Sequence, residues 1–333
     1  MKIIKYALKI VLTFGLLALI IYGFQVKLGS QGDILGQIKE NFKSLQYKYI
    51  LIAVLFFIAG SLLGALRIYL LTRAHDIKIS YLKLLENVYI GFLFNPILMG
   101  ATGGDIIRSY YLTRQTDKKT EIVTVVFLDR FIGVCVLGMV AMIVLLFNFS
   151  DPKLKTIFYG AMALYVFIMI FAILFSSRRV IKKFSFLDKY FSQSKIKDIA
   201  IKAFETLHHT KKYKLTLCLA ALCTLLFQSA FIYSAWLISN ALPNMEPIAL
   251  KYFYLFLPII FTIQAIPISL GGIGVGEAAY AALFGIVGVM EADAITISLI
   301  NRLIQIFGAF IGGIVYVLPS VEKVNIEEAL EQK

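Results

Sequence analysis

The sequence predicts an all-α membrane protein: a polytopic bundle of about six full spans plus two broken or re-entrant helical hairpins, arranged as an inverted repeat. The 333 residues are 59% apolar, above the usual composition of a soluble domain. Apolar runs of about 20 residues, the length that crosses a bilayer, recur along the chain. Two of these runs are interrupted by proline and glycine. An interrupted backbone is tolerated at membrane depth only where it is buried in protein or lines a wet cavity.

The two interruptions share a sequence pattern. Residues 95–108 read NPILMGATGGDIIR and residues 267–277 read PISLGGIGVGE. In each, a proline is followed four residues later by a glycine, and another glycine then directly precedes an acid, Asp105 in the first and Glu277 in the second. Proline removes a backbone donor and glycine loosens a helix. We therefore interpret each stretch as the end of one half-helix and the start of another, and predict that the two breaks face each other to form the site.

The first repeat, residues 1–150, begins with two expected spans. Lysines and then an apolar run at 4–26 predict a retained first helix rather than a removed signal peptide, because no small-residue cleavage site follows. Residues 27–48 read as a polar loop of mixed charge. Residues 49–71 form the next expected span, with Arg67 in its last turns.

The first broken segment covers residues 84–112. Basic residues flank it on both sides, which places both flanks in the cytoplasm by the positive-inside rule. Two full crossings would need about 40 residues, so a hairpin entering from the cytoplasm fits best. A helix at 122–149, with Asp129 and Arg130 in its first third, completes the repeat.

The second repeat, residues 156–320, has every direction reversed and begins with a span at 156–177. Residues 178–214 follow, with eleven basic residues against three acidic ones. The apolar residues of this stretch recur at helical spacing. We expect a cytoplasmic amphipathic insert on the inner leaflet, attracted by anionic lipid.

The rest of the second repeat contains its broken segment. A span from 215 to about 240 precedes a hairpin at 248–290, which would enter from the outside. Residues 291–293 are expected to form a short acidic turn. The last span, 294–318, has Arg302 embedded in it. Inverted repeats are common in transporters, with the site where the broken helices meet.

The formal net charge of +13 follows from this topology. Most basic residues fall in segments expected to be cytoplasmic, so the charge is a topology signal and predicts no nucleic-acid partner. The chain is expected to be a multi-pass protein of the cell inner (plasma) membrane with both termini in the cytoplasm. The three cysteines and three histidines have no metal-ligand spacing, and we predict no metal, cofactor or catalytic nucleophile.

Ionisable side chains at membrane depth are costly and are candidates for function. The arginine fork matches a phosphate, a half-helix N-terminus offers free amides and a positive dipole, and glycine lets the backbone come close to a ligand. Together they predict a site for an anionic lipid headgroup. The candidate substrate-binding residues are Gly103, Gly104, Asp105, Arg108, Asp129, Arg130, Gly271, Gly272, Gly274, Glu277, Arg302 and Arg67.

Several of these residues have a structural alternative. Asp105 and Glu277 are both placed to cap the helices that follow them, and Glu277 is deep enough to pair with an arginine or take up a proton. Asp129 is equally suited to a structural ion pair that ties the hairpin to the bundle. It points about 100° away from Arg130 on a helix, so the two need not pair. Arg67 has the alternative of a residue at the membrane interface, whose side chain extends to the lipid headgroups.

The motifs GGDIIRSYYLTR, LDRFIGV and PISLGGIGVGE together resemble the lysylphosphatidylglycerol synthase transmembrane-region family, which is also the flippase-like half of bacterial multiple-peptide-resistance proteins. The resemblance covers nearly the whole chain. It implies a polytopic inner-membrane protein that handles anionic or polyprenyl-phosphate lipids. The full synthases continue into a soluble aminoacyl-transferase domain, and this chain stops just after its last span, so we do not carry over synthase activity. The family pattern supports Gly103, Gly104, Asp105, Arg108, Asp129, Arg130, Pro267, Gly271, Gly272, Gly274 and Glu277, and more loosely Arg302.

Three functional hypotheses follow. The favoured one is a lipid translocase, not an enzyme, which moves an anionic or polyprenyl-phosphate headgroup across the membrane. The second is a membrane-embedded glycosyl or aminoacyl lipid transferase, with Asp105 or Asp129 as its base. The third is a non-catalytic partner of a soluble lipid-modifying synthase, docked by residues 178–214.

Overall fold

The computed structural model describes residues 34–95, 103–147, 213–265 and 272–317, with residues 159–160, 162–163, 165–166 and 269 between them. Every regular element in these ranges is a helix. Four of the helices are long and apolar enough to cross a membrane: α3 (Tyr47–Ala74), α6 (Lys119–Phe147), α10 (Lys214–Asn240) and α13 (Glu291–Val317). The predicted polytopic helical membrane bundle is confirmed. The expected span at 4–26, and nearly all of both the span at 156–177 and the insert at 178–214, lie outside the described residues.

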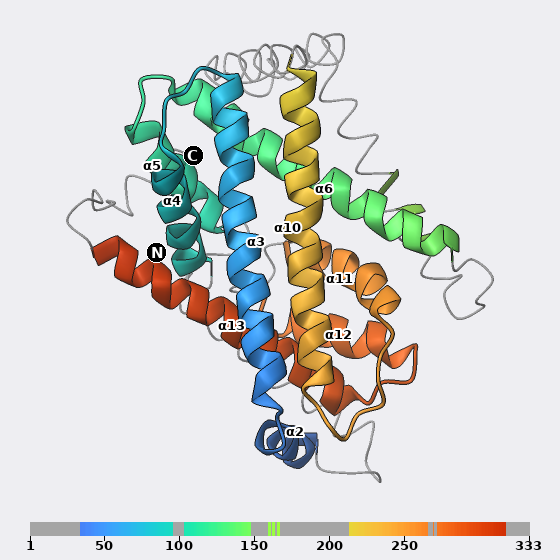
Figure 1. Cartoon of the computed structure of the whole chain (residues 1–333). Helices are drawn as coiled ribbons and strands as arrows, with labels where there is room; N and C mark the ends of the chain where they lie inside the picture. The colour runs from blue at the N-terminus through green and yellow to red at the C-terminus, as the bar shows by residue number, and fades with distance from the viewer. Residues whose placement is uncertain are drawn as a thin grey trace, which may run out of the picture.

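Helices α3 and α10 stand side by side and form the central pair (Figure 1). Two glycines one turn apart on α3 create the groove between them. A β-carbon added at Gly60 would lie 2.7 Å from the Phe231 ring, and one added at Gly64 would lie 3.3 Å from the Phe227 ring. In lipid, where apolar surface gains little by leaving its solvent, this close fit of small against large residues holds helices together.

The two broken segments are confirmed as pairs of short helices. The first pair is α4 (Tyr81–Phe94) with α5 (Gly103–Arg114), and the second is α11 (Leu250–Ala265) with α12 (Val275–Gly285). The members of each pair pack against each other. A helix of 14 residues is about 21 Å long, too short for the roughly 30 Å hydrocarbon core. The leaflet from which each pair enters, and the inverted repeat, stay predictions.

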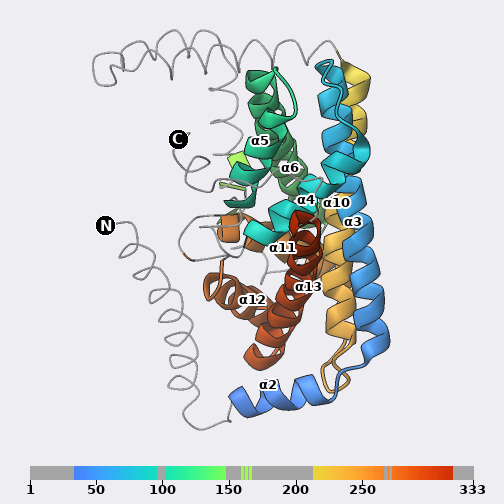
Figure 2. The same cartoon turned by 90° about the vertical axis from the view of Figure 1, so that its left-hand side faces the viewer.

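Residues 34–43 correct the sequence analysis, which expected a polar loop. They form α2 (Ile34–Lys43), which lies across the beginning of α3 (Figure 2). The helix is amphipathic: Ile34 and Asn41 are buried, whereas Lys39 and its charged neighbours face outward. The Asn41 amide donates a 2.7 Å hydrogen bond to Asp293. The expected acidic turn is also wrong, because Asp293 lies in the first turn of α13.

Helix α13 runs obliquely across the bundle and contacts α2, α4, α10 and α12 (Figure 1). Glycines again set its closest approach. A β-carbon added at Gly308 would meet the Phe57 ring at 2.6 Å, and one added at Gly312 would lie 2.8 Å from the carbonyl carbon of Tyr89 on α4. At Gly312 the obstacle is backbone, which cannot rotate away as a side chain can.

We expect Gly312→Ala to destabilise the protein by about 1–3 kcal/mol, the usual cost of overpacking. The matched control is Gly313→Ala. An added β-carbon there has Leu93 Cδ1 at 3.8 Å as its nearest neighbour, so this change should be neutral or slightly stabilising, since alanine favours a helix over glycine. The measurement is the fraction of detergent-solubilised protein that stays monodisperse after heating. Equal heat resistance of the two variants would contradict the packing described here.

Candidate functional site

The first charged cluster joins α5 to α6. Arg108 Nη1 donates a 3.0 Å hydrogen bond to Asp105 Oδ1, and Arg130 Nε donates to Asp105 Oδ2. Two guanidinium groups therefore share one carboxylate, and the three side chains carry a formal charge of +1. The side chains of Asp105 and Arg108 are 13% and 15% exposed, whereas that of Arg130 is 46% exposed. The cluster is thus anchored in the protein and open on its Arg130 side.

Helix α4 supports this cluster from behind. Asn87 Nδ2 donates to the Arg108 carbonyl at 3.1 Å and Asn87 Oδ1 accepts from Arg108 Nε at 3.4 Å. Gly91 makes room for the Arg108 stem, because an added β-carbon would lie 2.9 Å from Cγ. Asn95 Oδ1 accepts a hydrogen bond from the Gly104 amide at 3.0 Å, so Asn95 provides an acceptor for the first turn of α5. The Asp105 carboxylate holds the two arginines. Neither asparagine was predicted from the sequence, although each is a polar residue within an apolar run.

The second cluster is fully enclosed between α3, α6 and α10. Arg67 Nη2 donates to Asp129 Oδ2 at 2.7 Å, and Arg67 Nη1 donates to Thr224 Oγ1 at 3.4 Å. The Arg67 guanidinium also lies 5.2 Å from the centre of the Phe227 ring. Arg67 is 7% and Asp129 3% exposed. The interpretation of Arg67 as an interface residue is therefore wrong, because its charge is held inside the bundle.

Asp129 and Arg130 are neighbours on α6 that serve different clusters. Asp129 pairs with Arg67 of α3, and Arg130 pairs with Asp105 of α5. The expected ion pair between the hairpin and the bundle is therefore made by Arg130, whereas Asp129 connects two long helices. The two clusters are therefore connected through two consecutive residues of α6.

The third cluster lies where α12 begins. Glu277 is 1% exposed. Its Oε1 accepts from Arg302 Nε of α13 at 3.0 Å, and its Oε2 accepts from the Gly274 amide at 2.7 Å. Glu277 therefore both reaches back to the start of its own helix and pairs with an arginine, the two roles that the sequence left open. Whether it also takes up a proton stays a prediction.

The glycines before α12 adopt conformations that other residues rarely adopt. Gly272 has φ +72° and Gly274 has φ +84°, both in the left-handed region where a β-carbon is strained. Gly276 lies against Gln264 of α11, whose carboxamide carbon would be 3.2 Å from an added β-carbon. Pro267 and Gly271 lie outside the described residues, as do residues 96–102 of the first break.

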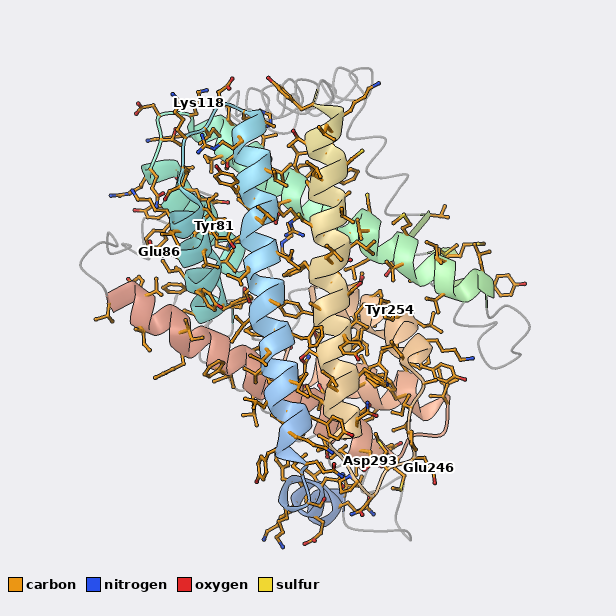
Figure 3. All side chains as sticks on the ribbon, viewed as in Figure 1. Tyr81, Glu86, Lys118, Glu246, Tyr254 and Asp293 are labelled. Atoms are coloured by element: carbon orange, nitrogen blue, oxygen red, sulfur yellow. The ribbon has the colours of Figure 1, made fainter. Side chains whose placement is uncertain are left out.

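The clusters lie at different heights in the bundle. Helix α5 lies beside the end of α3 and α12 lies nearer its beginning (Figures 1 and 2). In Figure 3, Lys118 lies at the end of the bundle where α3 ends, and Glu246 and Asp293 lie at the opposite end, where α3 begins. The described residues thus assign Asp105 and Glu277 to separate arginine-containing clusters. The predicted meeting of the two breaks concerns tips that are mostly outside the described residues, and it stays a prediction, as does substrate binding by any of these residues.

We expect Asp129→Asn to destabilise the protein by about 3–5 kcal/mol, because it leaves the Arg67 charge buried without its partner. The double variant Arg67→Leu/Asp129→Leu should recover much of this loss, since replacing a whole buried ion pair by apolar side chains is often close to neutral. Heat resistance in detergent measures both. The control is Glu40→Gln, which removes an exposed ion pair with Lys43 on α2. This change should leave the heat resistance unchanged. A double variant less stable than Asp129→Asn would contradict this account.

Comparison with known proteins agrees with this architecture. Residues 6–313 match the family model described as lysylphosphatidylglycerol synthase TM region. The chain is also similar to the UPF0104 membrane protein PH1989 of Pyrococcus horikoshii, with 26% identity over 292 residues, which covers 80% of this chain and 86% of that protein. The family match spans all the candidate residues named above. The chain therefore belongs to the lysylphosphatidylglycerol synthase TM region family.

Proposed function

We propose that the protein is a lipid translocase that moves an anionic or polyprenyl-phosphate headgroup across the cytoplasmic membrane. The observation that carries this proposal is the cluster of Asp105, Arg108 and Arg130. Both arginines are cations whose planar forks of N–H donors converge on the single carboxylate of Asp105. The side chain of Arg130 is about half exposed. A phosphate fits such a group of donors by charge and by the geometry of the fork.

The broken helices suit the transport step. A headgroup that crosses the membrane needs polar partners along its path, while its acyl tails stay in the hydrocarbon. Two pairs of short helices on a scaffold of long ones provide backbone ends at membrane depth. Rocking of one part against the other would expose the headgroup to each leaflet in turn. The sequence has no P-loop motif for ATP, so we propose that an ion gradient or the lipid gradient drives transport.

The proposed orientation has α5 and the start of α6 on the cytoplasmic side. Lys118, which lies between these helices, marks one end of the bundle (Figure 3). The positive-inside rule, which counts lysine and arginine near the ends of spans, would place the end with Lys118 and Lys119 in the cytoplasm. Both termini would then be cytoplasmic, as the sequence predicts, and the membrane would be the cell inner membrane.

The transferase hypothesis finds less support in these contacts. A general base needs a carboxylate that is free to take a proton from the substrate. Asp105 is engaged by two arginines and Asp129 by one, together with the Thr224 contact on that arginine. The guanidinium partners occupy the oxygens of both carboxylates. The partner hypothesis depends on residues 178–214, nearly all of which lie outside the described residues.

Arg130→Gln should slow headgroup flipping roughly 10- to 100-fold, because a hydrogen bond to a charged group contributes about 1.5–3 kcal/mol. The measurement uses vesicles containing the purified protein and a fluorescent phosphatidylglycerol. Quenching from outside reports the rate at which label reaches the outer leaflet. An added ion gradient in the same vesicles tests the driving force.

Arg114→Gln is the matched control, because it removes an arginine from the exposed end of α5 outside the cluster. It should flip the labelled lipid at the rate of the unchanged protein. Equal rates for all three proteins would refute the proposed headgroup contact. No flipping above that of protein-free vesicles by the unchanged protein, for anionic and polyprenyl-phosphate lipids alike, would refute translocation itself.

A further inference from the structure

The start of α12 has the parts of an anion-binding site, and a carboxylate of the protein already occupies it. Glu277 is almost fully buried, yet its two oxygens are held by the backbone amide of Gly274 and by the guanidinium of Arg302. A helix N-terminus and an arginine fork are the two groups that proteins commonly use to bind phosphate. What they hold in this structure is an internal anion.

Glycines bring the backbone of the α12 N-terminus close to the groups that surround Glu277. Residue 274, which precedes the first residue of α12, is glycine, so it has no side chain that could accept from the first amides of the helix. A β-carbon added at Gly276, in the first turn, would have Arg302 Nη2 at 3.5 Å, which shows how closely the guanidinium approaches the helix start. Gln264 of α11 also packs against Gly276, so Glu277, Arg302 and Gln264 together surround the first turn of α12.

A buried hydroxyl in the same connection points independently to a ligand. Ser269 is 4% exposed, and its Oγ has no hydrogen-bond partner among the described residues. Its carbonyl accepts a 3.4 Å hydrogen bond from the Gly272 amide, so it lies in the turn that leads into α12. Buried polar groups are nearly always hydrogen-bonded, and an orphan indicates a group that binds in another state or an unseen water.

We propose that Glu277 is a stand-in for the substrate: its carboxylate occupies a phosphate-binding site formed by the α12 N-terminus and Arg302, and the lipid phosphate displaces it during transport. This inference rests on the proposed function and adds a second phosphate site to it, nearer the beginning of α3 than the Arg130 cluster. Both occupants are anions with at least two acceptor oxygens, so one set of donors serves them in turn.

Replacing Glu277 by glutamine tests the exchange, because it removes the competing charge and keeps the shape. Purified Glu277→Gln should bind fluorescent phosphatidylglycerol in detergent roughly tenfold more tightly than the unchanged protein. Diacylglycerol, which lacks the phosphate, should show no gain. Inorganic phosphate is the third probe: a gain for it as well assigns recognition to the phosphate alone, and a gain for the lipid only shows that the tails contribute. Either result supports the exchange.

Two further variants complete the experiment. Glu246→Gln removes the same charge from an exposed position at the same end of the bundle (Figure 3) and should leave binding unchanged. Glu277→Asp, with a carboxylate too short to span Gly274 and Arg302 together, should bind with intermediate affinity, and it keeps the test valid if the glutamine variant does not fold. Unchanged or weaker lipid binding by the position-277 variants would overturn the exchange. If the unchanged protein still flips lipid in that case, the proposed function stands; if it neither binds nor flips lipid, the function fails too.

Discussion

Charge at membrane depth has to be neutralised, and this requirement orders the bundle. Among the described residues, four arginines (Arg67, Arg108, Arg130 and Arg302) pair with three carboxylates (Asp105, Asp129 and Glu277), and each of these three carboxylates is held by at least one arginine. Every pair except Asp105 with Arg108 joins two different helices. A misplaced helix would therefore leave a charge unpaired in a medium where water cannot solvate it, at a cost of several kcal/mol. The pairs select one arrangement from the many that apolar packing alone would allow.

Glycine provides the second constraint, because ion pairs need helices that come close. The grooves at Gly60 and Gly64 bring α3 to α10, and Gly312 brings α13 to the backbone of α4. Helix α13 then presents Arg302 to the start of α12, while α6 presents Asp129 to α3 and Arg130 to α5. The site is therefore a consequence of scaffold packing. The broken helices contribute the carboxylates Asp105 and Glu277, and the long helices contribute most of the arginines that hold them.

The sequence predicted the parts that depend on composition and local pattern. Apolar runs identified the long spans that the structure describes, and proline with glycine identified both interruptions. What it could not provide was the choice of partner. Arg67 near the end of an apolar run looks the same whether it extends to the headgroups or pairs with Asp129, because that partner is 62 residues away along the chain. Asn87 and Asn95 were missed for the same reason. Helix α2 was missed because its polar face dominates the composition of a short segment, and only its contact with α13 explains its buried face.

The central claim is that the cluster in which Arg108 and Arg130 share the Asp105 carboxylate binds a negative lipid. Native mass spectrometry of the protein purified from its membrane tests this claim most directly, because it identifies the lipid that remains bound. We expect the unchanged protein to retain an anionic phospholipid or a polyprenyl phosphate, and Arg130→Gln to lose most of it while staying folded. Retention of neutral lipids only, or equal retention of the anionic lipid by both proteins, would contradict the claim.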